Sequence, residues 1–230
     1  MDITIDTVRI PNAPVEKLSA YFARPAAEGR YPGVVIIHEA FGLTENIKDI
    51  ARRFANEGYA ALAVDLFAGR NQVVCMFRFF GGMFLSSMDN EAIRSLKASL
   101  SYLEQHPNVD ASKLGAIGFC MGGGFAIAWA CTDSRLNVIA PFYGVNPRPL
   151  AAVARSCPVV ASYPEQDFTA GMGLKLAAEL DRHNVTHDVK VYPGAKHSFF
   201  NDERPANYDA AASADAWQRT LAFFEQHIGG

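Results

Sequence analysis

The run from Gly115 to Phe125 limits the fold of this chain more than any other stretch of its sequence. Apolar residues lead into Gly118, then Cys120 and Gly122 follow at alternate positions, and two further glycines open an apolar helical pattern. This spacing predicts a strand, a sharp turn and a helix, with the turn residue raised above the edge of a sheet. The residues flanking such a turn must lack a Cβ atom, because strand and helix approach closely there. We therefore expect a sheet whose strands run directly into helices, with Cys120 at one such turn.

Cys120 is a candidate nucleophile in this position. At the N-terminus of a helix, the helix dipole and the free N–H groups favour a thiolate and can also hold an oxyanion. The alternative is a small buried apolar residue, as free cysteines often are. The motif alone leaves both interpretations open, and residues elsewhere in the chain favour the nucleophile.

Composition restricts the class of protein. The 230 residues are 50% hydrophobic, which suits a single α/β domain over residues 1–230, and the net charge of −3 offers no surface for nucleic acid. The acidic N-terminus is unlike a secretory signal, and the apolar segment Val73–Met88 is interrupted by Arg78 and two glycines, so we expect no membrane span. The four cysteines lack C-x-x-C or zinc-like spacing. We expect reduced thiols, no metal and a cytoplasmic location.

Strand and helix patterns alternate along the chain. Strands are predicted at 3–10, 18–23, 33–37, 59–64, 114–118, 138–142, 158–162 and 188–192. Helices are predicted from a cap at Thr44 to a stop at Gly58, from Ser87 or Asp89 to a stop before Pro107, and over 121–130, 174–183 and 209–226. This order predicts an α/β fold with a mostly parallel, doubly wound sheet of about eight strands and helices on both faces. The active site of such a sheet lies at the carboxyl ends of its strands.

Cys120 shares that edge with two later candidates, Asp167 and His197, each in a loop just past a predicted strand. The order nucleophile, acid, histidine is that of an α/β-hydrolase triad. His197 would take the thiol proton, and Asp167 would fix the tautomer of the imidazole. Glu165 is a rival for the acid. His38 lies near the same edge, but it precedes the nucleophile in the chain, contrary to the order of the fold.

Glu39 directly follows the predicted strand 33–37, where hydrolases of this fold place a loop that supplies an oxyanion-hole N–H. We expect the N–H groups of Ala40 and Met121 to point at the developing oxyanion. A carboxylate beside that hole repels negative charge. We therefore interpret Glu39 as a proton acceptor or gate for the Cys120 thiol, with a solvated loop glutamate as the alternative.

Six pieces spread over nearly the whole chain occur together. They are His38-Glu39-Ala40-Phe41-Gly42-Leu43, Asp65-Leu66-Phe67, Gly118-Phe119-Cys120-Met121-Gly122-Gly123, Phe142-Tyr143-Gly144, Asp167, and Tyr192-Pro193-Gly194-Ala195-Lys196-His197-Ser198-Phe199. In this combination the chain resembles the dienelactone hydrolase (carboxymethylenebutenolidase) family. The resemblance implies an α/β-hydrolase fold, a Cys120, His197 and Asp167 triad, and a glutamate, Glu39, that takes part in activating the cysteine. It also implies oxyanion-hole amides from Ala40 and Met121.

The sequence departs from this family at the substrate. Its best-known members carry an arginine four residues after the catalytic histidine, to hold a substrate carboxylate, and here that position is Asn201. Arg204, Arg78 or Arg70 could reach the same space, and no motif selects among them. The segment Val73–Met88 is also unusually apolar for a substrate-contacting region. We expect four side chains to contact the substrate: Phe41, Arg78, Tyr143 and Arg204.

The sequence thus predicts a hydrolase that cleaves a lactone or activated ester through a thioester on Cys120, with no cofactor. A thiolate attacks carbonyls readily but is itself a good leaving group, so it suits a substrate with a good leaving group. The other possibilities are an acyltransferase or thioesterase with the same triad, and a non-catalytic binding or redox-sensing protein. The expected partner is a small ester or lactone, with no nucleic acid or membrane, and the protein is expected to be a monomer or homodimer.

Overall fold

Within the residues that this computed structural model describes, 1–76, 81 and 88–229, eight strands form one sheet. In sequence order they are β1 (Ile3–Arg9), β2 (Ser19–Pro25), β3 (Tyr31–Ile37), β4 (Ala60–Asp65), β5 (Val109–Phe119), β6 (Val138–Phe142), β7 (Val159–Gln166) and β8 (His187–Lys196). The order across the sheet is β1-β2-β4-β3-β5-β6-β7-β8. Each of these strands overlaps one that the sequence predicts, and the α/β-hydrolase sheet is confirmed.

The sheet is parallel from β4 to β8 and antiparallel at β1 and β2. Residues 34–37 of β3 are fully buried, as expected for a strand whose two faces are both covered. In the register of the sheet Ile37 lies beside Gly118, and Phe119 lies beside Phe142. The residues that follow these three strands therefore meet at one edge.

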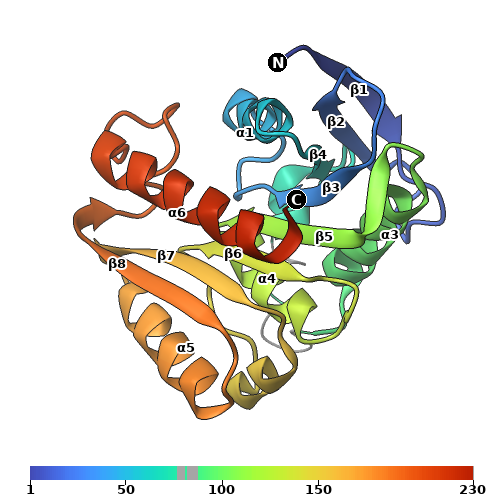
Figure 1. Cartoon of the computed structure of the whole chain (residues 1–230). Helices are drawn as coiled ribbons and strands as arrows, with labels where there is room; N and C mark the ends of the chain where they lie inside the picture. Colours follow the sequence, from blue (N-terminus) through green and yellow to red (C-terminus); the bar gives the residue numbers. More distant parts are fainter. Residues whose placement is uncertain (77–80, 82–87, 230) are drawn as a thin grey trace.

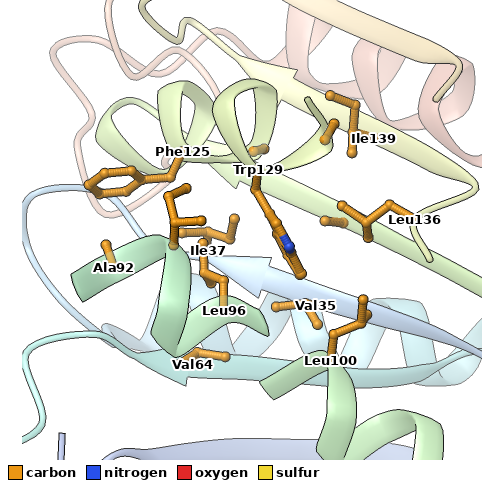
Figure 2. Close-up of a cluster of buried hydrophobic side chains, with 14 of the residues drawn as sticks. Val35, Ile37, Val64, Ala92, Leu96, Leu100, Phe125, Trp129, Leu136 and Ile139 are labelled. Atoms are coloured by element: carbon orange, nitrogen blue, oxygen red, sulfur yellow. The ribbon is translucent and has the colours of Figure 1, made fainter. Parts of the chain in front are cut away.

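Helices cover both faces of the sheet (Figure 1). One face carries α1 (Glu45–Asn56) and α6 (Ala210–Ile228). The other carries α3 (Glu91–Gln105), α4 (Met121–Ala130), α5 (Ala170–Arg182) and the short 3-10 helix η1 (Leu150–Arg155). All ten residues of α4 are buried, which explains its apolar sequence. Figure 2 shows side chains from α4, α3 and the strands in one cluster: Phe125, Trp129, Leu96, Leu100, Val35 and Ile37.

Helix boundaries differ from the expectation in two places. The cap of α3 is Asn90, whose Oδ1 atom accepts a hydrogen bond from the Ile93 N–H at 3.1 Å, and not Asp89; Ser87 lies outside the described residues. Helix α5 begins at Ala170 rather than at residue 174. Its first turns contain glycine, and a Cβ atom on Gly173 would lie 2.5 Å from the Tyr163 ring. The close packing of α5 on β7 thus requires glycine at position 173, and glycine weakens the helical pattern of the sequence.

No helix among the described residues combines the length and the apolar character that crossing a membrane requires. Most of the apolar segment Val73–Met88, including residues 77–80 and 82–87, lies outside the described residues.

Candidate active site

Cys120 sits on a strained turn between β5 and α4. Its backbone has φ +55° and ψ −115°, a conformation that non-glycine residues rarely adopt. Glycine is required on both sides of Cys120 because any side chain would clash with the backbone there. A Cβ atom on Gly118 would lie 2.1 Å from the carbonyl oxygen of Gly122. A Cβ atom on Gly122 would lie 2.4 Å from the carbonyl oxygen of Ile37. The Gly-x-Cys-x-Gly spacing therefore matches the geometry that it predicts.

The thiol of Cys120 is half-buried and faces two backbone amides. Burial, and then the charge of Glu39, raise its pKa to about 12, while hydrogen bonds from the N–H groups of Met121 and Ala40 oppose this shift. Asp167 adds a smaller negative contribution. The resting side chain is therefore a neutral thiol at physiological pH.

His197 and Asp167 form a hydrogen-bonded pair at the same edge of the sheet. The Nδ1 atom of His197 lies 2.5 Å from Asp167 Oδ2. Each residue comes directly after a strand, Asp167 after β7 and His197 after β8. The rival Glu165 is exposed, and its Oε2 atom accepts the N–H of Gly194 at 3.0 Å. The structure thus brings Asp167, and not Glu165, to the histidine.

The rest of the pair's surroundings was not predicted from sequence. The hydroxyl of Thr169, fully buried, donates to the same Asp167 Oδ2 atom at 2.6 Å. The Nδ2 atom of Asn207 donates to the carbonyl oxygen of His197 at 2.7 Å. The exposed ring of Phe168 stacks on the imidazole, 6.2 Å between centroids and 10° between planes. Thr169 could have been found from its spacing, because threonine two residues after an aspartate can reach its side chain; Asn207 carries no local signal.

Glu39 is buried, with 3% of its surface exposed, which rules out a solvated loop glutamate. Its Oε1 atom accepts the Ser198 hydroxyl at 2.7 Å, and its Oε2 atom accepts the Asn201 amide at 2.7 Å. Both donors are neutral. The carboxylate therefore has hydrogen bonds but no cationic side chain among these partners. Neither Asn201 nor Ser198 was assigned a role from sequence.

The candidate substrate residues have different surroundings. Phe41 is 40% exposed, and the guanidinium carbon of Arg204 lies 3.8 Å from its ring centroid. Tyr143 is buried, with its ring centroid 5.0 Å from that of His197, so its side chain packs against the catalytic candidates instead of opening to solvent. Arg70 binds Glu91 at 2.6 Å. Arg78 lies outside the described residues.

The arrangement has the parts of an acyl-transfer site: a sulfur atom, two backbone N–H groups that favour its thiolate, and a histidine hydrogen-bonded to an acid. Among the described residues, His197 Nε2 makes no hydrogen bond to the Cys120 sulfur. No group of three or more His, Cys, Asp and Glu side chains in that part of the chain is placed to hold a metal ion.

This sheet, with a strained cysteine turn and an acid–histidine pair past two later strands, defines an α/β-hydrolase. The model of the dienelactone hydrolase family matches residues 18–228, and the chain belongs to that family and is a hydrolase.

Known proteins resemble the chain over its whole length. A protein of Synechocystis sp. named "Putative carboxymethylenebutenolidase" is 31% identical over 246 residues, covering 99% of each chain. Two solved structures superimpose closely. One, described as a dienelactone hydrolase-like promiscuous phosphotriesterase from metagenomic libraries, has a TM-score of 0.88 at 28% identity and covers 100% of both chains. The other, a "Putative Dienelactone Hydrolase" from Klebsiella pneumoniae, has a TM-score of 0.84 at 29% identity and covers 99% of this chain and 100% of its own.

Proposed function

We propose that this protein hydrolyses a lactone or an activated ester through a thioester on Cys120, with His197 as base and acid and Asp167 as its orienting carboxylate. The observation that carries the proposal is the meeting of three features at one edge of the sheet. These are the strained cysteine, the two amides at its sulfur, and the 2.5 Å contact between His197 and Asp167. Membership of the dienelactone hydrolase family supports the same chemistry.

The reaction begins when the Cys120 proton passes to His197 Nε2, with Glu39 as an intermediate acceptor, and the sulfur attacks the carbonyl carbon. A C–S bond forms, and the oxyanion of the tetrahedral intermediate is held by the N–H groups of Ala40 and Met121. When the intermediate collapses, the C–O bond to the leaving oxygen breaks and that oxygen takes the proton from His197. Water then attacks the thioester and gives a proton to His197. The C–S bond breaks, and the sulfur takes that proton from His197, which regenerates the thiol.

Glu39 acts in this scheme as a gate on the thiol. Its negative charge opposes the thiolate in the free enzyme, because like charges at short distance disfavour joint ionisation. Its carboxylate is held on two neutral donors, Ser198 and Asn201, which leaves it able to accept a proton when substrate fills the site. We expect Phe41 and Arg204, whose side chains stack on each other, to contact the substrate.

The test is a screen of the purified protein against lactones and short aryl esters, with multiple turnovers measured and the acyl-enzyme trapped by mass spectrometry. Hydrolysis by the wild type, an adduct on Cys120, and loss of both in Cys120→Ala support the proposal. Turnover that persists in Cys120→Ala removes it. Preferential transfer to an added alcohol or thiol acceptor identifies an acyltransferase, and stoichiometric binding without turnover identifies a binding protein.

A further inference from the structure

His38 is fully buried at the end of β3 and takes no part in the mechanism above. Its Nε2 atom accepts a hydrogen bond from the backbone N–H of Leu66 at 3.1 Å. Its Nδ1 atom lies 2.6 Å from the carbonyl oxygen of Glu39. The ring of Phe67 packs beside the imidazole, with 4.8 Å between centroids. Both ring nitrogens thus have a backbone partner, one on each of two neighbouring loops.

These partners fix the tautomer of His38. A backbone amide can only donate, so Nε2, which faces the Leu66 N–H, carries the lone pair. The proton of the neutral ring is then on Nδ1 and is donated to the Glu39 carbonyl. Burial favours this neutral form because it lowers the pKa of His38, although the hydrogen bond to Glu39 and the charge of Asp65 act in the opposite direction. His38 therefore donates one hydrogen bond, from Nδ1, and accepts one, at Nε2.

The Glu39 carbonyl that accepts this proton belongs to the same planar peptide as the Ala40 N–H, and the two groups point in opposite directions. The Ala40 N–H is one of the two backbone amides whose interaction with the Cys120 thiol lowers its pKa. The N–H of Gly42 also donates to the Glu39 oxygen, at 3.3 Å, so this oxygen has two donors. A donor on the carbonyl fixes the peptide plane and polarises it, which strengthens its N–H as a donor.

We propose that His38 is a positioning residue of the oxyanion hole, which holds the Glu39–Ala40 peptide so that the Ala40 N–H points at the oxygen of the tetrahedral intermediate. His38 touches no reacting atom. This role rests on the proposed function, but the alignment of the Ala40 N–H against the Cys120 sulfur can be measured without turnover. The alternative is a purely structural role, in which His38 links the ends of β3 and β4 through its hydrogen bond with the Leu66 N–H.

Three substitutions separate the two roles. His38→Asn places an amide near the Nδ1 position, where it can donate to the Glu39 carbonyl but cannot reach Leu66. His38→Gln places its amide near the Nε2 position and keeps an acceptor for the Leu66 N–H. His38→Leu removes both hydrogen bonds and retains an apolar side chain in the buried site.

Steady-state kinetics on an aryl ester give the first readout. His38→Leu should lower kcat on the order of 10-fold and change KM less than about twofold, because a misaligned donor weakens the transition state and not substrate binding. His38→Asn should recover most of kcat, and His38→Gln should not. An aryl trifluoromethyl ketone, which forms a tetrahedral adduct with a thiol, should bind His38→Leu more weakly by the same factor as the loss in kcat/KM.

Alkylation of Cys120 by iodoacetamide at fixed pH gives a second readout that needs no turnover. Because the Ala40 N–H lowers the pKa of the thiol, its misalignment in His38→Leu should slow alkylation, and His38→Asn should restore the rate. If the wild type hydrolyses nothing in the screen, the proposed function fails, and the alkylation series still decides the role of His38.

The matched control is His106→Leu. The Nδ1 atom of His106 also accepts a backbone hydrogen bond, from Asn108 at 3.3 Å, but this residue caps α3 before the start of β5, at the opposite edge of the sheet. Its loss should lower stability and leave kcat and alkylation unchanged. The proposal is overturned if His38→Leu keeps the wild-type kcat and alkylation rate, or if His38→Gln, and not His38→Asn, restores them.

Discussion

At the scale of single residues, one oxygen of Asp167 accepts two hydrogen bonds, from His197 and from the buried hydroxyl of Thr169. Thr169→Val removes the second donor and keeps the shape of the side chain. A hydrogen bond to a charged group contributes about 1.5–3 kcal/mol, and its loss leaves the carboxylate less firmly oriented. We expect kcat to fall about 10-fold at nearly constant KM, and Thr169→Ser to restore most of it.

The control for this prediction is Thr220→Val. Thr220 is as deeply buried as Thr169, but its hydroxyl donates to the Ala216 carbonyl within α6 at 2.8 Å. The kcat of Thr220→Val should equal that of the wild type. Equal losses of kcat in both variants would mean that the effect comes from destabilisation and not from the orientation of Asp167.

The charge of Glu39 leads to a prediction in which two rates move in opposite directions. Glu39→Gln removes the negative charge that, after burial, contributes most to raising the pKa of Cys120 to about 12. The pH profile of iodoacetamide alkylation should therefore shift to lower pH, so that resting alkylation is faster, while hydrolysis is slower because the carboxylate that passes the thiol proton to His197 is lost. Both rates are measured on the same preparation.

The control for Glu39 is Glu165→Gln, which changes an exposed carboxylate near the end of β7, two residues before Asp167. It should change neither rate by more than about twofold. A parallel fall of alkylation and hydrolysis in Glu39→Gln, with an intact circular dichroism spectrum, would show that the carboxylate promotes the thiolate and would remove the gating role.

The positions of the proposed catalytic residues were largely predictable from the sequence. Cys120, Glu39, Asp167 and His197 each follow a strand, and the carboxyl ends of parallel strands meet at one edge, so topology alone brings them together. The partners that hold them were not predictable. Their contacts depend on the direction of side chains in loops, which no local pattern specifies.

At the scale of elements, the N-termini of α1 and α3 differ in capping. Asn90 accepts the Ile93 N–H at the start of α3, whereas Thr44 stands at the N-cap of α1 without a side-chain cap bond. Asn90→Ala should lower the free energy of unfolding by about 1 kcal/mol. Thr44→Ala, the matched substitution, should change it by less than about 0.5 kcal/mol. Urea denaturation measures both, and a loss for Thr44→Ala as large as that for Asn90→Ala would contradict this account of the caps.

Strands were predicted better than helix ends. A strand buried on both faces needs a run of apolar residues, and β3, β4 and β6 show it directly. The early start of α5 was missed because Gly171 and Gly173 disfavour a helix in isolation. Packing against Tyr163 of β7 outweighs that preference in the folded protein.

At the scale of the whole molecule, His38 makes stability depend on pH. The unfolded chain binds a proton on this histidine near its ordinary pKa of 6.5, whereas burial lowers the pKa of His38 in the fold. The neutral ring therefore stabilises the fold above pH 6.5, and this contribution is lost as the pH falls from 6.5 toward the folded pKa.

Urea denaturation of the wild type and His38→Asn at a series of pH values below 6.5 tests this prediction. Below that pH the wild type should lose up to about 1.4 kcal/mol per pH unit more than the variant, because the asparagine binds no proton. His106 and His227, whose pKa values burial also lowers, contribute equally to both proteins and cancel in the difference. Parallel curves would mean that His38 does not titrate on unfolding.

The sequence by itself determined the order of strands and helices, the cysteine turn and the edge of the sheet that carries the proposed site, since these depend on neighbouring residues and on the parallel topology. Only the tertiary structure decided between Asp167 and Glu165, and only it joined Glu39 to Asn201, 162 residues away. The reason is physical: a local pattern specifies which face of an element is buried, but the partner of a buried polar group depends on how distant loops pack together.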